Sequence, residues 1–202
     1  MKTSLRLFCI ALSASAAVAQ EPVPLKEAQN AARKLTDSLG VLRDLPMATE
    51  PDLEKPQAIK AGGAGVLILP DRKLTAESLS GASQTSTPIG QLWTHQVSLA
   101  KDGKAVARDQ LRVVSVTEKE KRADVQLYLL GAAKNDAGAL ELVVFGKAKE
   151  PLLRVPLVQR RGGSQELPLA LSVRKNEEGS GFLSVNILGE YTVELGVVRE
   201  AQ

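Results

Sequence analysis

The chain has 202 residues, a formal net charge of +3 and a single cysteine, Cys9. A chain of this length can bury a sizeable hydrophobic core, so the composition predicts one globular domain held together without a disulfide. The nearly balanced charge and the 3% content of aromatic residues exclude the basic, aromatic-rich surface of a nucleic-acid-binding protein, and we expect no nucleic-acid partner.

The first 19 residues have the three parts of a secretory signal peptide. They are a charged start (Lys2 and Arg6), a short apolar segment (residues 7–12) and small residues before the cleavage site (Ala17-Val18-Ala19). We predict cleavage after Ala19 and export to the periplasm or the exterior. Removing the signal lowers the formal charge from +3 to +1, and it leaves a mature chain without cysteine.

Two forms of membrane attachment are disfavoured by the sequence. Lipidation at Cys9 is disfavoured because the bulky Phe8 directly precedes the cysteine. No stretch after the signal reaches the ~20 apolar residues that cross a bilayer, so we expect no transmembrane segment in the mature chain.

Residues 20–62 are expected to hold an N-terminal helix and a proline-containing linker. Apolar residues recur at helical spacing from residue 25 to residue 45: Leu25, Ala28, Ala32, Leu35, Leu39 and Leu42. Pro24 suits a helix start, Pro46 suits a stop, and Gly40 weakens the last part. The stripe predicts a helix that packs on the following domain, with a coiled coil or a membrane-surface helix as alternatives. Residues 47–60 are interpreted as the linker.

The glycine-rich segment 62–65 invites comparison with a phosphate-binding loop. In that motif the glycines follow a strand and open a helix, whereas here they precede a short apolar run that ends at Pro70. We therefore interpret them as a tight entry into a strand of the β domain that we assign to residues 63–202.

The polar segment 75–89 is the strongest candidate for a binding loop. Its length exceeds that of most connections, and long loops on rigid scaffolds often carry function. The candidate partner-binding residues in it are Ser83, Gln84, Thr85, Ser86 and Thr87.

Residues 91–117 predict a β-hairpin around the pair Asp102-Gly103, which favours a turn with positive φ. Alternation places Trp93, His95, Val97 and Leu99 on one face of the first strand. The return strand is expected over residues 105–117.

The rest of the chain alternates in the manner of antiparallel strands. Further strands are predicted over residues 123–130, 139–146, 152–159, 166–175, 183–187 and 191–197. Pro151 and Pro156 favour an edge or bulged position for the third of these, and Gly189-Glu190 suggests a type II′ turn. The predicted fold is a mainly β, meander-like antiparallel sandwich of about eight or nine strands after one helix, with a closed barrel as the alternative.

The inventory of catalytic residues is small. His95 is the only histidine, and its place in the predicted strand favours a buried, hydrogen-bonded core histidine over a catalytic base. We find no metal-binding motif and no signature of a cofactor or of a catalytic site. We therefore expect no metal, no cofactor and no enzymatic activity.

Three hypotheses of function remain open. The first is an exported, non-catalytic interaction or accessory protein that binds a protein partner through loops or an edge strand. The second is a carrier of a small apolar or amphipathic ligand, with Trp93 and His95 near the mouth of its cavity. The third is a hydrolase that uses His95 or a pair of carboxylates.

Overall fold

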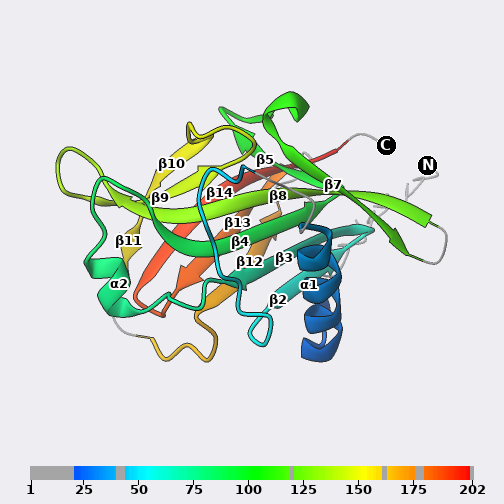
Figure 1. The fold of residues 1–202 in the computed structure, drawn as a ribbon, viewed down its shortest axis with the longest axis horizontal. Coiled ribbons are helices and arrows are strands. Elements are labelled where there is room, and N and C mark those ends of the chain that lie inside the picture. The colour runs from blue at the N-terminus through cyan, green and yellow to red at the C-terminus, as the bar shows by residue number, and fades with distance from the viewer. Residues whose placement is uncertain (1–20, 40–43, 119–120, 161–162, 176–179, 201–202) are drawn as a thin grey trace, which may run out of the picture.

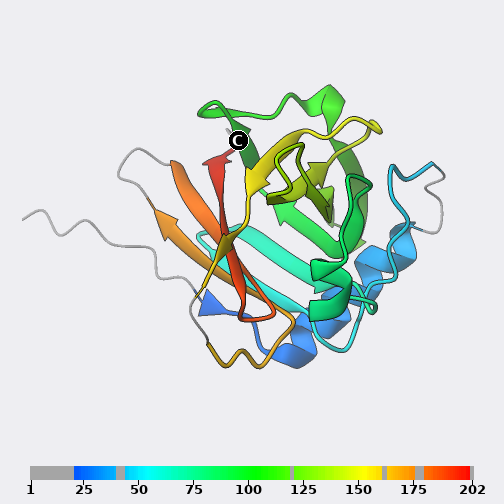
Figure 2. The same cartoon turned by 90° about the vertical axis from the view of Figure 1, so that its left-hand side faces the viewer.

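The computed structural model describes residues 21–39, 44–118, 121–160, 163–175 and 180–200. The predicted signal peptide with Cys9 and the cleavage after Ala19 lies outside these residues, as do Gly40 and Leu42. Within them, two antiparallel sheets pack face to face and neither closes into a barrel (Figures 1 and 2). The predicted β-sandwich is confirmed.

The larger sheet has eight strands in the order β1-β2-β3-β4-β8-β9-β10, with β7 paired to the first half of β8. The strands are β1 (Glu21–Pro22), β2 (Gln57–Ala61), β3 (Ala64–Pro70), β4 (Thr87–His95), β7 (Arg112–Glu118), β8 (Lys121–Lys134), β9 (Leu140–Phe145) and β10 (Leu153–Pro156). Pro156 ends β10 at the edge of this sheet, which confirms the edge position expected from the prolines.

The smaller sheet has six strands in the order β12-β13-β14-β5-β6, with β11 paired to β14. They are β5 (Val97–Lys101), β6 (Lys104–Ala105), β11 (Val158–Gln159), β12 (Leu169–Lys175), β13 (Ser180–Ile187) and β14 (Tyr191–Arg199). Burial alternates along β13, where Leu183, Val185 and Ile187 point inward and the residues between them are half-buried. This is the pattern of a sheet with one face on the core and one toward water.

The larger sheet is covered on both faces. Its inner face packs on the smaller sheet through residues such as Ile68, Leu92 and Leu130. Its outer face packs under α1 (Leu25–Leu39), which crosses β2 and β3 in Figure 1. Ala28, Ala32 and Leu35 are the buried residues of this helix. The prediction that the helix packs on the β domain is therefore confirmed, although Leu25 remains 52% exposed.

The predicted hairpin over residues 91–117 is wrong, although its turn is correct. Asp102 and Gly103 have φ values of 53° and 75° and join β5 to the short β6. The first strand, however, breaks at Gln96, where φ is 56°, and the chain passes from the larger sheet to the smaller one. Trp93 then belongs to the core under α1 and Leu99 to the core between the sheets. Residues 112–118 form β7, which pairs with β8 and not with β5.

The segment interpreted as a linker also contains a strand. Residues 57–61 form β2, which pairs with β3 across a two-residue turn at Gly62 and Gly63. Both glycines have positive φ, 55° and 86°, and glycine adopts that conformation without a steric penalty. Alternation over residues 57–61 is weak because the larger sheet buries side chains on both faces, so the strand pattern was missed.

The polar segment 75–89 contains a short helix and the start of a strand. Residues 76–80 form the short helix α2 (Ala76–Ser80), capped by reciprocal hydrogen bonds between Thr75 and Ser78 at 2.9 and 3.0 Å. Strand β4 already begins at Thr87. The predicted II′ turn at Gly189-Glu190 is wrong in position and type, because Leu188 and Gly189 are the central residues and both have positive φ, 54° and 72°, as in a type I′ turn.

Candidate functional site

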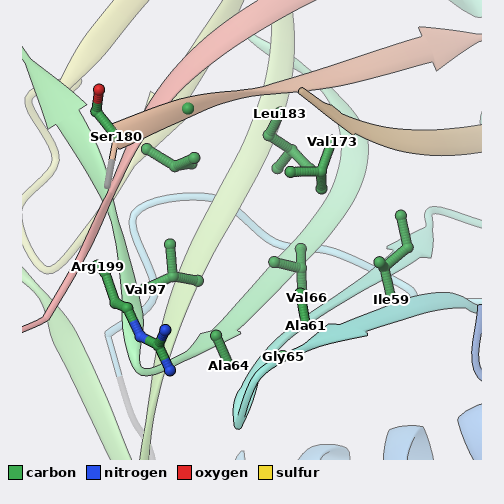
Figure 3. A pocket seen from close by; sticks show the side chains of 12 residues that line it. Ile59, Ala61, Ala64, Gly65, Val66, Val97, Val173, Ser180, Leu183 and Arg199 are labelled. Carbon is green, nitrogen blue, oxygen red and sulfur yellow. The ribbon is translucent and has the colours of Figure 1, made fainter. Parts of the chain in front are cut away.

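The sandwich has an apolar hollow of about 200 Å³ at the end where the β2–β3 hairpin turns, which we call the end cavity (Figure 3). Its walls come from both sheets. The larger sheet contributes β2 and β3, and the smaller sheet contributes β5, β12, β13 and β14. The lining residues are Ile59, Ala61, Ala64, Gly65, Val66, Val97, Val173, Ser180, Gly181, Leu183, Val197 and Arg199.

Small side chains explain why the two sheets leave space at this end. Deeper in the core the inner faces carry Leu, Ile and Val residues that fill the gap between the layers. Toward the end cavity the facing positions are Ala61, Ala64 and Gly181. The volume missing from these side chains is not replaced by neighbouring atoms, because the backbones of two hydrogen-bonded hairpins hold the sheets in place.

One cation marks the rim of this apolar hollow. Val193, Leu195, Val197 and Arg199 form one row of β14, and the first three belong to the core between the sheets. Arg199 is exposed and continues the row where the sandwich opens; its guanidinium donates a hydrogen bond to the carbonyl oxygen of Gly62. Figure 3 shows its side chain extending beside Val97 toward Ala64.

The other polar lining residue does not face the hollow. Ser180 lies in the outward row of β13 with Phe182, and Figure 3 shows its hydroxyl pointing away from the other lining side chains. Of the described residues that line the end cavity, Arg199 is therefore the only one with a charged side chain.

A second hollow, which we call the helix groove, lies between α1 and the outer face of the larger sheet and has a volume of about 610 Å³. Both Trp93 and His95 line it. Trp93 is fully buried, and its indole N–H donates to Gln91 Oε1 at 3.1 Å. Gln91 in turn donates to Thr49 Oγ1 at 2.8 Å. This indole is a core residue with a satisfied donor and offers no open stacking face.

His95 lies next to a polar hollow lined also by Gln96, Arg122, Ala123, Asp124 and Glu200. Its Nδ1 is 3.0 Å from the carbonyl oxygen of Asp124. Because a carbonyl oxygen only accepts, Nδ1 carries a proton and donates this hydrogen bond. The histidine is half-buried at the end of β4, so the expectation of a buried core histidine is wrong. It is hydrogen-bonded, as expected.

The carboxylate of Asp124 is held by its neighbours. Ser115 Oγ donates to Oδ1 at 2.7 Å, and Arg108 donates to Oδ2 at 2.7 Å. The Ser115 hydrogen bond is the main reason that the pKa of Asp124 lies below its ordinary value; burial opposes it, and Arg108 and Arg122 add to the lowering. A carboxylate in this state stays ionised at neutral pH and serves the β7–β8 hairpin as a structural anion.

The two groups of sequence-predicted site residues lie at opposite ends of β4. Thr87 begins the strand and His95 ends it, which separates them by about 25 Å at the usual rise per residue. Ser83, Gln84 and Thr85 are exposed, while Ser86 and Thr87 are half-buried. Ser83 is tied to the sheet because its carbonyl oxygen accepts from the Lys134 N–H at 2.7 Å.

The described residues hold no group of three or more His, Cys, Asp or Glu side chains placed to bind a metal ion. None of the helices in the described ranges is long and apolar enough to span a membrane.

The fold and the end cavity define a class of protein: an antiparallel β-sandwich with a helix on one outer face and an apolar hollow between its sheets at one end. No family model, no curated protein and no solved structure matches this chain. The candidate site therefore rests on its own geometry.

Sequence reasoning missed the end cavity because its walls combine residues that are far apart in the chain, from Ile59 to Arg199. One local signal existed, since Arg199 ends an alternating apolar row that begins at Val193. That signal identifies the end of a strand. It does not show that the small residues Ala61 and Ala64 of the β2–β3 hairpin lie opposite.

Proposed function

We propose that the protein is an exported, non-catalytic binding protein that carries a small apolar or amphipathic ligand in the end cavity. The observation that supports this is the apolar lining of a concave site built from both sheets, with one charged side chain at its rim. A volume of about 200 Å³ suits a small ligand, because a dry apolar cavity of about 150 Å³ already binds benzene.

Binding of a protein partner through residues 83–87 or an edge strand stays a prediction with weaker support. The segment that was expected to be a long free loop contains a capped helix and the start of β4. The hydrolase hypothesis also stays a prediction, since in the described residues no hydroxyl or carboxylate is hydrogen-bonded to the imidazole of His95.

The proposal is tested with octan-1-ol, a neutral probe with a chain of suitable size. Methyl resonances of Val66, Val97, Val173 and Val197 are followed by NMR during the titration, because these four side chains line the end cavity. For a ligand of about nine non-hydrogen atoms we expect a dissociation constant of about 0.01–1 mM.

A blocking variant and a matched control locate the site. Ala64→Phe places a ring in the cavity from the inner row of β3, whereas Ala105→Phe adds the same ring at an exposed position of β6. We expect the first to abolish the methyl shifts and the second to leave them unchanged. Shifts that persist in Ala64→Phe, or that are absent in the unmodified protein, overturn the proposal.

A further inference from the structure

We propose that the ligand of the end cavity is a short-chain monocarboxylate, held with its apolar chain between the sheets and its carboxylate on the guanidinium of Arg199. This inference rests on the proposed function and adds the chemistry of the head group. It is carried by the contrast between the apolar walls of the cavity and Arg199, the one cation among its described lining residues.

The contact with Gly62 does not use all the N–H donors of the Arg199 guanidinium. Within the described residues its side chain donates to the carbonyl oxygen of Gly62 and forms no ion pair with a carboxylate. Other arginines of the described chain do have such partners: Arg174 lies 3.1 Å from Glu194, and Arg108 lies 2.7 Å from Asp124. An arginine has five N–H donors, and a carboxylate matches two of them in parallel.

Glu200, the acidic residue next to Arg199 in sequence, is engaged by a different partner. Glu200 Oε1 accepts from the side-chain amide of Gln126, and Glu200 lines the polar hollow on the side of His95. It does not line the end cavity. Among the described residues, the rim therefore presents only positive charge to a ligand, and this favours an anionic head over a cationic one.

The position of Arg199 also sets the direction of the ligand. In Figure 3 the guanidinium lies at one side of the cavity near Ala64, and the branched side chains of Ile59 and Leu183 lie toward the opposite side. Ile59 and Leu183 are buried, with 9% and 0% exposure, while Arg199 is exposed. A ligand that places its chain inward and its charge outward loses little hydration of the head group.

The volume limits the length of the chain. Scaling from the cavity of about 150 Å³ that holds the six carbons of benzene, about 200 Å³ accommodates roughly eight non-hydrogen atoms. Octanoate fits this limit with its seven chain carbons inside and its carboxylate at the rim. Long-chain fatty acids exceed it.

The test compares three probes of equal chain length: octanoate, octan-1-ol and octylammonium. Each is titrated by valine-methyl NMR into the unmodified protein and into Arg199→Gln, Arg199→Lys and Arg174→Gln. Arg174 is the matched control because it lies on the outer face of the same sheet, with its guanidinium 5.3 Å from the ring centre of Phe182.

We expect the unmodified protein to bind octanoate about fivefold more tightly than octan-1-ol, as a partly exposed charge pair allows, and octylammonium most weakly. Arg199→Gln is expected to remove this preference by weakening the binding of octanoate. Arg199→Lys should keep part of the preference, and Arg174→Gln should keep all of it. Sodium chloride should reduce the preference in the unmodified protein.

The two proposals fail in different ways. Equal affinity for octanoate and octan-1-ol, or an unchanged preference in Arg199→Gln, overturns the carboxylate inference and leaves the carrier function standing. Failure of all three probes to shift the cavity methyls overturns both. Tighter binding of octan-1-ol than of octanoate would identify a neutral polar head, which also contradicts the inference.

Discussion

The backbone N–H of Leu99, in the smaller sheet, donates a hydrogen bond at 3.2 Å to the hydroxyl of Tyr128, in the larger sheet. Both residues are fully buried. The same hydroxyl donates to Gln126 Oε1 at 2.6 Å and lies 3.2 Å from Ser98 Oγ. One phenol thus satisfies the backbone where β5 starts and links the two layers of the sandwich.

Removing this hydroxyl should destabilise the fold. In Tyr128→Phe the Leu99 N–H and the Ser98 hydroxyl lose a buried partner, and we expect the free energy of unfolding to fall by about 1–3 kcal/mol. Urea denaturation followed by circular dichroism measures the change. Tyr191→Phe is the control, because the described residues form no hydrogen bond with its hydroxyl. Equal effects of the two substitutions would contradict this role for Tyr128.

Stability should also depend on pH through Tyr128. Burial raises the pKa of its hydroxyl above the ordinary value of 10.0, despite opposing hydrogen bonds from Ser98 and Leu99. A pKa that is higher in the folded state means that the neutral phenol stabilises the fold below pH 10. This contribution is lost as the pH rises through the folded pKa.

We therefore expect the free energy of unfolding to decrease above about pH 10, and to decrease less in Tyr128→Phe. Because other groups titrate in the same range, the measured quantity is the difference between the two proteins at pH 8, 10 and 11. A difference that does not change with pH would show that Tyr128 does not ionise on unfolding.

Gly90 should not tolerate a side chain. A Cβ at this position would lie 2.2 Å from the carbonyl oxygen of Leu69, which is backbone and cannot move without breaking the β3–β4 pairing. We expect Gly90→Ala to cost about 1–3 kcal/mol, as overpacking does. Gly65→Ala is the control, since a Cβ there meets nothing within 4 Å. Thermal unfolding of both variants tests this, and a stable Gly90→Ala protein would contradict it.

Gln57 joins the edges of the two sheets. Its side-chain Oε1 accepts from the N–H of Leu171 on β12, and its Nε2 lies 3.5 Å from the carbonyl oxygen of the same residue. Gln57→Ala leaves these half-buried backbone groups without a partner, and we expect a loss of about 1–2 kcal/mol. Gln84→Ala removes only an exposed contact with Asp136 and should change little. Chemical denaturation of both variants distinguishes them.

Trp93 should report on folding and not on the ligand. As the only tryptophan and a fully buried one, it should resist quenching by iodide in the folded protein and become accessible in urea. Octan-1-ol should leave its emission unchanged, because Trp93 faces the core under α1 and the end cavity lies on the other side of the larger sheet. Strong iodide quenching of the folded protein would contradict the buried placement.

Several features followed from short-range patterns in the sequence. The Asp102-Gly103 turn was predicted because positive φ at two successive positions restricts the residues that fit. The helical stripe through Ala28, Ala32 and Leu35 was predicted because residues three or four positions apart lie on the same face of a helix. Alternation also identified β13 and β14, whose outer face is open to water.

Other features depend on residues far apart in the chain. The strand containing Trp93 and Leu99 looked continuous because its apolar residues keep their alternation through Gln96, yet the backbone changes sheets there. Likewise, β2 was missed because its outer row contains the buried Ala58 and its inner row contains the polar Gln57, so apolar and polar residues do not alternate.

By itself, the sequence determined the class of fold, the position of α1 and the Asp102-Gly103 turn, because each depends on residues only a few positions apart. The tertiary structure decided which strands pair, where Trp93 and His95 lie, and that Ala61 and Ala64 face β12 and β13 across a hollow with Arg199 at its rim. These relations arise when two sheets pack and their side-chain volumes do not match, a property that no single segment contains.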